Sequence, residues 1–169
     1  IKETSILTIA TQFENLQSLF DSDVTKDIKF RKKQLRALRK SIKTNESALI
    51  SALQQDLGKN SVESYATEIG YIYKSISFML KEVKSLASKR NVNTPVFLFP
   101  GKSYTINEPY GTVLIIGPFN YPFQLVIEPL IGAIAAGNCA VIKPSELTPN
   151  VSIVIEKIIQ EAFNPSYVS

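Results

Sequence analysis

The feature that most constrains the fold is the stretch at residues 108–146, EPYGTVLIIGPFNYPFQLVIEPLIGAIAAGNCAVIKPSE. Residues 111–116 form a nearly continuous apolar, β-branched run, which is typical of a strand covered on both faces in a parallel sheet. Pro122 stands where the first turn of a helix begins, and the residues that follow it are apolar nearly all round, as in a buried helix. Residues 139–142 then predict a second buried strand.

A strand–helix–strand unit of this kind crosses over right-handed and places its two strands side by side and parallel. The loops that follow the two strands, residues 117–121 and 143–148, therefore emerge at the same carboxyl edge of the sheet. Ligands of open α/β sheets bind at that edge. We expect Asn120, Lys143 and Glu146 to be neighbours in one crevice, although Asn120 lies more than twenty positions before the other two in the sequence.

These three side chains have a chemistry that suits such a crevice. The amide of Asn120 can donate a hydrogen bond to an oxygen that develops negative charge, and it precedes the positive end of a helix. Lys143 and Glu146 can serve the two hydroxyls of a ribose, one by donating and the other by accepting. The alternatives from residue type alone are a loop or cap residue for Asn120 and a surface ion pair for Lys143 and Glu146.

Amphipathic patterns account for most of the remaining chain. Apolar residues at spacings of three and four predict four further helices. These helices are expected over residues 1–21, 26–57, 61–87 and 148–162. Tyr167 and Val168 are predicted to begin a further strand, so the fold class is α/β: N-terminal helices followed by part of a Rossmann-like parallel sheet.

A change in residue composition between the predicted helices and the predicted sheet indicates an extended β arm. Pro95 and Pro100 bracket the apolar run Val-Phe-Leu-Phe, and residues 102–107 alternate polar and apolar. Two extended segments joined through Pro100 and Gly101 are expected, as an arm that pairs with another chain or a later segment. The predicted division is a helical part at 1–90, the arm at 91–108 and the first part of the cofactor-binding sheet at 109–169.

The composition is that of one ordinary soluble domain, with 44% hydrophobic and 20% charged residues in 169. The apolar runs are too short to span a bilayer, and a cytoplasmic protein is the expectation. Histidine is absent, which excludes Ser-His-Asp and Cys-His sites and removes the commonest metal ligand; no metal site is predicted. Cys139 is the single cysteine, so an internal disulfide is excluded.

The net charge of +4 comes mainly from basic residues between Lys29 and Lys43, which share one arc of the second predicted helix. A solvated helix face is the ordinary interpretation of such a run. The alternative, functional interpretation is a basic ridge that binds phosphates, in a non-catalytic nucleotide-binding or partner-binding module. No interleaved aromatic or glycine-rich element supports the ridge, so nucleic acid is not an expected partner.

Several motifs in fixed order carry a resemblance to a known family. They are PYGTV from Pro109, IGPFNYP from Ile116, AAGN from Ala135, and KPSE from Lys143, followed by Thr148-Pro. Together they closely resemble the aldehyde dehydrogenase superfamily. The FNYPF version and the Asn-Cys after Ala-Ala-Gly are most similar to its class 3, fatty-aldehyde branch, and the resemblance runs from about Phe30 onward.

The resemblance implies an NAD(P)-dependent oxidation of an aldehyde to a carboxylic acid through a cysteine thiohemiacetal. By this similarity Asn120 is the side-chain donor of the oxyanion hole. Seven residues are expected to bind the NAD or NADP cofactor. They are Ile116, Gly117, Pro118 and Phe119, which line the cofactor cleft, and Lys143, Ser145 and Glu146, which hold the adenosine ribose. The family also implies a homodimer of the full-length protein, built with the β arm.

The family's nucleophilic cysteine and general-base glutamate lie beyond the part of the family that this chain resembles. Cys139 belongs to the Ala-Ala-Gly-Asn-Cys motif at a strand start, so it is expected to be a small buried residue and not the nucleophile. The chain is therefore expected to be an N-terminal portion of such an enzyme. Without the catalytic domain, the isolated chain is expected to be inactive.

Overall fold

The structure is a computed structural model that describes residues 5–169. Its longest helix, α2 (Ile28–Leu57), begins where the Asp27 side chain accepts a hydrogen bond from the backbone N–H of Lys29, and it ends at Gly58 in the left-handed conformation. The buried apolar residues of α2 lie on one side, as the spacing predicts. They are Leu35, Leu38, Ile42, Leu49, Ala52 and Leu53.

The helix before it, α1 (Ile6–Asp21), is capped by Ser5, and the first four residues of the predicted helix lie outside the described ones. Its predicted apolar stripe is buried only at Leu16; Ile9 and Phe13 are each 50% exposed. The apolar stripe is therefore largely exposed to solvent over the first half of the helix. An amphipathic pattern fixes which face is apolar but not what packs on that face. The helix α1 contacts the sheet, and Leu16, Leu19 and Phe20 in its second half pack in or against the core.

The third predicted helix is interrupted by a change of helical register. It consists of α3 (Ser61–Ser64), a π-helical segment (Tyr65–Ile69) and α4 (Gly70–Leu86), and Asn60 caps its start. Ile69, Ile72, Ile76 and Val83 of the predicted stripe are buried. A π-helical turn inserted in an α-helix is often found at functional sites, where it redirects side chains.

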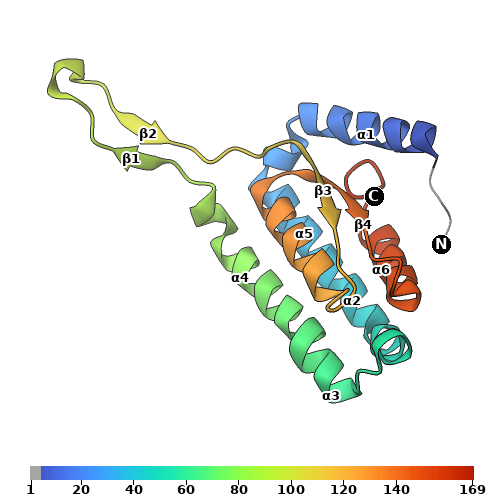
Figure 1. Ribbon diagram of the computed structural model, residues 1–169. Coiled ribbons are helices and arrows are strands. Elements are labelled where there is room, and N and C mark those ends of the chain that lie inside the picture. Colours follow the sequence, from blue (N-terminus) through green and yellow to red (C-terminus); the bar gives the residue numbers. More distant parts are fainter. Residues whose placement is uncertain (1–4) are drawn as a thin grey trace.

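The predicted arm is an antiparallel hairpin of β1 (Arg90–Val92) and β2 (Ser103–Thr105), which extends away from the helices (Figure 1). Its tip differs from the expectation of extended chain. Val96–Leu98 form a 3₁₀ turn, because the N–H of Leu98 donates to the carbonyl of Pro95 at 2.9 Å. The apolar side chains of this turn are exposed, Phe97 to 85%.

The predicted strand–helix–strand unit is present. Strands β3 (Thr112–Ile116) and β4 (Cys139–Lys143) pair in parallel, with Ile116 beside Lys143, and α5 (Gln124–Ala136) connects them. The last helix, α6 (Pro149–Ala162), follows β4 and has Pro149 in its first turn, as predicted. Val168 bridges to Ala140 in parallel, so the predicted further strand begins beside β4.

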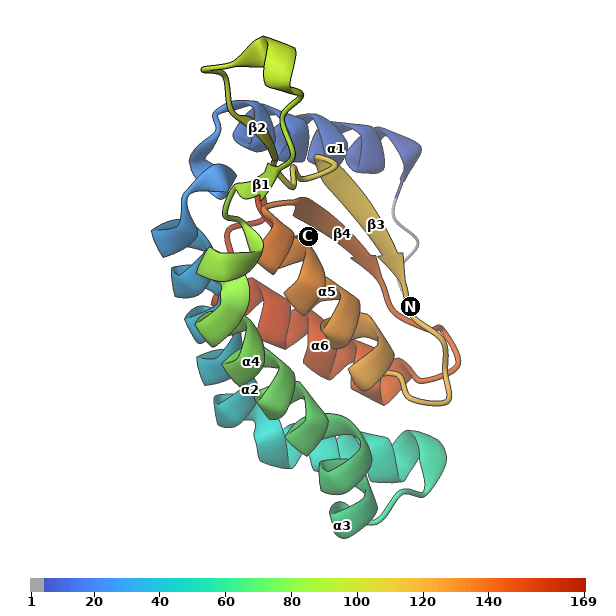
Figure 2. The same cartoon turned by 90° about the vertical axis from the view of Figure 1, so that its left-hand side faces the viewer.

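The helices cover this sheet unequally. Figure 2 shows α2, α4, α5 and α6 gathered on one side of β3 and β4. On β3 the alternating residues Leu114 and Ile116 are 62% and 66% exposed, whereas Ile115 between them is buried. Within the described residues one face of β3 is therefore largely open, so these residues alone do not supply the cover on both faces that the apolar run indicates.

Charged residues from the α2 region fix the ends of the helices next to the sheet. The guanidinium of Arg31 donates to the carbonyl of Ala135 in the last turn of α5 and to the carbonyl of Thr25. Gly137 ends α5 with φ 95°, and a Cβ on it would lie 2.6 Å from the Arg31 guanidinium. A cation at a helix C-terminus is favourable because it faces the negative end of the helix dipole.

Asp56, near the C-terminal end of α2, caps the N-terminus of α6. Its carboxylate accepts from the backbone N–H groups of Asn150 and Val151, at 3.4 and 2.8 Å, and from the Asn150 side chain at 2.7 Å. This anion faces the positive end of α6. Of the helices described in residues 5–169, none is long and apolar enough to cross a membrane.

Candidate functional site

The candidate site lies at the carboxyl ends of β3 and β4, where the two predicted loops meet. The N–H of Gly117 donates to the carbonyl of Lys143 at 3.0 Å, so the two loops begin side by side. A Cβ on Gly117 would lie 2.1 Å from the Val126 side chain of α5. This position therefore has no room for any other residue, and the first loop turns directly over α5.

The second loop carries the predicted ribose-binding pair. Lys143 and Glu146 form an ion pair, and both side chains are more than half exposed. The hydrogen bond from Lys143 holds the pKa of the Glu146 carboxyl below its ordinary value. The pair therefore presents a donor and an ionised acceptor together at the end of β4, as reasoned from the sequence.

The other predicted cofactor residues divide into exposed and buried groups. Ile116, Pro118 and Phe119 are exposed beside the loop junction, and Phe119 retains 51% of its surface. Ser145 is buried, and its Oγ accepts a hydrogen bond from the N–H of Leu147. In this structure the Ser145 hydroxyl therefore stabilises the turn that carries Glu146.

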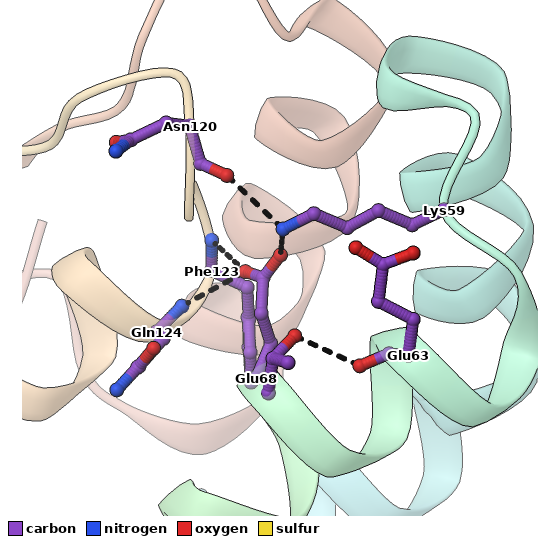
Figure 3. Close-up of polar contacts among 7 residues, drawn as sticks. Lys59, Glu63, Glu68, Asn120, Phe123 and Gln124 are labelled. Carbon is purple, nitrogen blue, oxygen red and sulfur yellow. Dashed lines mark hydrogen bonds and ion pairs between the residues drawn. The ribbon is translucent and has the colours of Figure 1, made fainter.

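Asn120 is exposed on the first loop, on the same edge as Lys143 and Glu146. Its backbone carbonyl accepts a hydrogen bond from Lys59 Nζ at 3.0 Å. Figure 3 shows the side-chain amide of Asn120 pointing away from this contact. The sequence did not indicate any partner for this loop outside the sheet.

The partner is a buried ion pair between Lys59 and Glu68. Lys59 Nζ donates to Glu68 Oε1 at 2.5 Å, and the side chains are 9% and 0% exposed. Glu68 Oε2 accepts from the backbone N–H groups of Phe123 and Gln124, at 2.9 and 3.2 Å. The same ammonium lies 4.1 Å from the ring centroid of Tyr121. The two charges thus contact both ends of the segment 120–124 (Figure 3).

Sequence reasoning missed both residues of this pair, although the pattern held one signal for them. Glu68 lies three residues after Tyr65 and four before Ile72, on the apolar stripe of the predicted helix. An acidic residue on an apolar face has to be paired when it is buried. Lys59 follows the helix-ending Gly58 and gives no such signal.

Cys139 is fully buried, as predicted, and burial raises the pKa of its thiol to about 11. Because the thiolate is the nucleophilic form, the raised pKa disfavours reaction of this cysteine at neutral pH. Within residues 5–169 no cluster of three or more His, Cys, Asp or Glu residues is arranged to hold a metal ion.

The basic arc of α2 is exposed at Lys29, Lys33, Arg36 and Lys40, and Lys43 pairs with Glu46 at 3.5 Å. This distribution is that of a solvated face. Arg31, from the same stretch of sequence, is buried in a structural role.

Comparison with known proteins identifies the class to which this fold and site belong. The profile of the aldehyde dehydrogenase family matches residues 14–169, so the match begins earlier than the resemblance at Phe30. The chain therefore belongs to the aldehyde dehydrogenase family, a family of oxidoreductases.

Individual relatives agree with this assignment. The chain is 59% identical over 160 residues to 4,4'-diaponeurosporen-aldehyde dehydrogenase of Staphylococcus aureus, covering 95% of this chain and 35% of that protein. It is 38% identical over 150 residues to aldehyde dehydrogenase family 3 member A2 of Rattus norvegicus, covering 89% of this chain and 31% of the relative. The predicted class 3 resemblance is confirmed. The chain spans about a third of the length of these curated relatives.

Solved structures confirm the fold. The substrate-bound state of AldH from Staphylococcus aureus superposes with a TM-score of 0.94 at 58% identity, over 98% of this chain and 36% of that one. A betaine aldehyde dehydrogenase of Staphylococcus aureus, solved in complex with NAD⁺, gives a TM-score of 0.82 at 26% identity, over 99% of this chain and 34% of that one.

Proposed function

We propose that this chain is the N-terminal third of an NAD(P)-dependent aldehyde dehydrogenase that oxidises an aldehyde to a carboxylic acid. The backbone hydrogen bond from Gly117 to Lys143 is the observation that carries this proposal, because it holds together, at one sheet edge, the loops that carry Asn120 and the Lys143–Glu146 pair. Family membership supports the reaction class. The nucleophilic cysteine and the general base would come from the other two thirds of the enzyme.

In the proposed reaction, Asn120 is the catalytic residue that this chain supplies. Its exposed side-chain amide would donate to the aldehyde oxygen as that oxygen becomes negative during attack by the cysteine thiolate. Such a donor acts on the transition state more than on the bound aldehyde, so it raises kcat. The N-terminus of α5 follows directly and adds a favourable dipole.

The residues at the loop junction fit a nicotinamide dinucleotide. Lys143 and Glu146 would bind the adenosine ribose, and Ile116 and Phe119 offer exposed apolar surface beside them. When bound, the nicotinamide accepts the hydride from the substrate. The Glu146 carboxylate disfavours a 2′-phosphate, whereas Lys143 beside it would attract one, so both NAD and NADP stay within the proposal.

The arm supports a homodimer in the complete enzyme. Its tip exposes Phe97 and Phe99, each to 85%, at the end of a hairpin that stands away from the helices (Figure 1). Exposed apolar patches of this kind mark protein contacts. We propose that residues 91–108 form the arm that pairs with the second subunit; the cytoplasmic location stays a prediction.

The test is the oxidation of an aliphatic aldehyde by the complete enzyme, followed by the absorbance of the reduced cofactor. We expect turnover with NAD⁺ or NADP⁺, and a kcat that falls by about 10²- to 10³-fold in Asn120→Ala. Asn107→Ala is the matched control, because Asn107 donates to Leu86 at the base of the arm. An unchanged kcat in Asn120→Ala would contradict the role of this amide.

The same assay on residues 1–169 alone tests the division of labour between the parts of the enzyme. We expect no turnover, because Cys139 is buried with a raised pKa and the chain has no other cysteine. Clear turnover by this chain would contradict the proposal that the nucleophile lies elsewhere.

A further inference from the structure

We propose that Lys59 and Glu68 are positioning residues for the oxyanion donor, holding residues 120–124 so that the Asn120 amide faces the reacting aldehyde oxygen. This inference rests on the proposed aldehyde dehydrogenase function. Neither side chain is placed to touch the substrate, since both are buried beneath the loop. They act through the backbone of the segment that carries Asn120.

Glu68 fixes the end of this segment that enters α5. The N-cap position of α5, Phe123, has no side-chain cap of its own, and the first-turn N–H groups of a helix need partners. Glu68 Oε2 accepts from the N–H groups of Phe123 and Gln124, from a position 55 residues earlier in the chain. A carboxylate at this terminus also stabilises the positive end of the helix dipole.

Lys59 fixes the other end of the segment. Its ammonium donates to the Asn120 carbonyl at 3.0 Å and lies over the Tyr121 ring at 4.1 Å from the centroid. Because the backbone carbonyl is bound, the direction of the Asn120 side chain is constrained. Among residues 5–169, no hydrogen bond engages the Asn120 amide itself, so the amide keeps its donors for a ligand.

The two charges are matched to each other as well as to the loop. A buried carboxylate or ammonium is strongly unfavourable without a partner, and here each balances the other. The other hydrogen bonds of both charges end on residues 120–124. The π-helical segment Tyr65–Ile69 includes Glu68, so a local change of helical register accompanies its inward placement.

The alternative is a purely structural ion pair that joins the loop after α2 and the π-helical segment Tyr65–Ile69 to the start of α5. The two roles differ in what they change. Displacement of a catalytic group by about 1 Å lowers the rate by about 10²-fold even when the fold is kept. If the pair is purely structural, its removal lowers the melting temperature and leaves kcat per folded molecule unchanged.

The experiment uses the complete enzyme with Glu68→Gln, Lys59→Met and the double variant Lys59→Met/Glu68→Gln. The double variant removes both charges together, so no unpaired buried charge remains to unfold the protein. We expect kcat to fall by about 10- to 100-fold, with the KM for the cofactor within about twofold of wild type. Asn45→Ala is the control: Asn45 is a buried polar residue of α2 that bonds Glu161 at 2.7 Å, away from the loop. It should lower the melting temperature and leave kcat unchanged.

A double-mutant cycle with Asn120→Ala separates positioning from stability. If Glu68 acts through the Asn120 amide, Glu68→Gln should lower kcat by no more than about threefold once that amide is gone. If Glu68→Gln still lowers kcat by the full factor of about 10 to 100 on the Asn120→Ala background, the positioning role is overturned. An unchanged kcat in all three charge variants would overturn it as well.

Amide hydrogen exchange distinguishes failure of this inference from failure of the proposed function. In Glu68→Gln we expect faster exchange at residues 117–124 and unchanged exchange in α6, whatever the reaction. Absence of aldehyde oxidation by wild type would overturn the proposed function, and the catalytic role of the pair with it. Aldehyde oxidation by wild type with unchanged exchange at residues 117–124 in the variant would overturn only the positioning inference.

Discussion

Single side chains at the loop junction divide into those that present chemistry and those that hold the backbone. Asn120, Lys143 and Glu146 are exposed and carry polar groups that can reach a ligand. Gly117 acts by having no side chain, since α5 occupies the space that a Cβ would need. Ser145 is turned inward and stabilises the second loop.

Glu146 offers a prediction at this scale. In the complete enzyme, Glu146→Ala should raise the KM for NAD⁺ by roughly 10- to 100-fold with little change in kcat, because one charge-assisted hydrogen bond to the cofactor is lost in ground and transition states alike. Steady-state kinetics against NAD⁺ measures both constants. Glu156→Ala, an exposed carboxylate of α6, is the control. A fall in kcat at constant KM would contradict the ribose-binding role.

Cys139 provides a second prediction at the scale of one residue. Its thiol should resist alkylation at neutral pH in the folded protein, because burial raises its pKa to about 11. Peptide mapping after brief iodoacetamide treatment measures the modification. Cys139→Ala should keep kcat within about twofold. Rapid alkylation of Cys139, or loss of turnover in the variant, would contradict the assignment of this cysteine to the core.

At the scale of elements, α2 and the π-helical segment Tyr65–Ile69 supply the charges that fix the neighbouring helices. Glu68 faces the N-terminus of α5, Arg31 faces its C-terminus, and Asp56 faces the N-terminus of α6. Each charge has the sign that the helix dipole favours. The elements that carry the candidate site are therefore positioned by electrostatic contacts from the helical part of the chain as well as by apolar packing.

Asp56 tests this description of the elements. Asp56→Ala should destabilise the first turn of α6 by about 1–2 kcal/mol, because two backbone N–H groups lose their acceptor. Hydrogen exchange at Val151 and Ser152 measures the local change. Glu156→Gln removes an exposed charge from the same helix and should stay within about 0.5 kcal/mol of wild type. Equal exchange in the two variants would contradict the capping role.

At the scale of the whole molecule, the described chain forms a helical layer against one side of a narrow parallel sheet. Leu114 and Ile116 remain exposed on β3, and the arm exposes Phe97 and Phe99. Parallel sheets are ordinarily covered on both faces. These surfaces have the character of interfaces with further protein.

The chain on its own should therefore associate or precipitate. We expect residues 1–169 to sediment as oligomers, because contiguous apolar patches on β3 and the arm are open to solvent. Analytical ultracentrifugation across a concentration series measures this. Leu114→Lys should shift the distribution toward monomer. Lys102→Glu, which exchanges one exposed charge for another just before β2, should not. A wild-type chain that stays monomeric at every concentration would contradict the expectation.

Much of this architecture could be predicted from sequence, because apolar periodicity and the right-handed crossover of strand–helix–strand units depend on residues that are close together in the chain. They predicted the order of elements, the parallel strands and the common sheet edge of the loops that carry Asn120, Lys143 and Glu146. The Lys59–Glu68 pair could not be predicted, since a contact between two charges and a distant loop has no periodic signature. The exposure of Ile9 and Phe13 on α1 could not be predicted either, because periodicity does not reveal which partner covers a face.

The contact between Arg31 and Gly137 has a consequence for how sequences of this type can diverge. Position 137 requires glycine for two independent reasons, a φ of 95° and the guanidinium that occupies the space of a Cβ. Loss of Arg31 removes only the second reason. Drift should therefore be one-directional: relatives with another residue at 31 and glycine at 137 are expected, while relatives that keep arginine at 31 and replace the glycine are not.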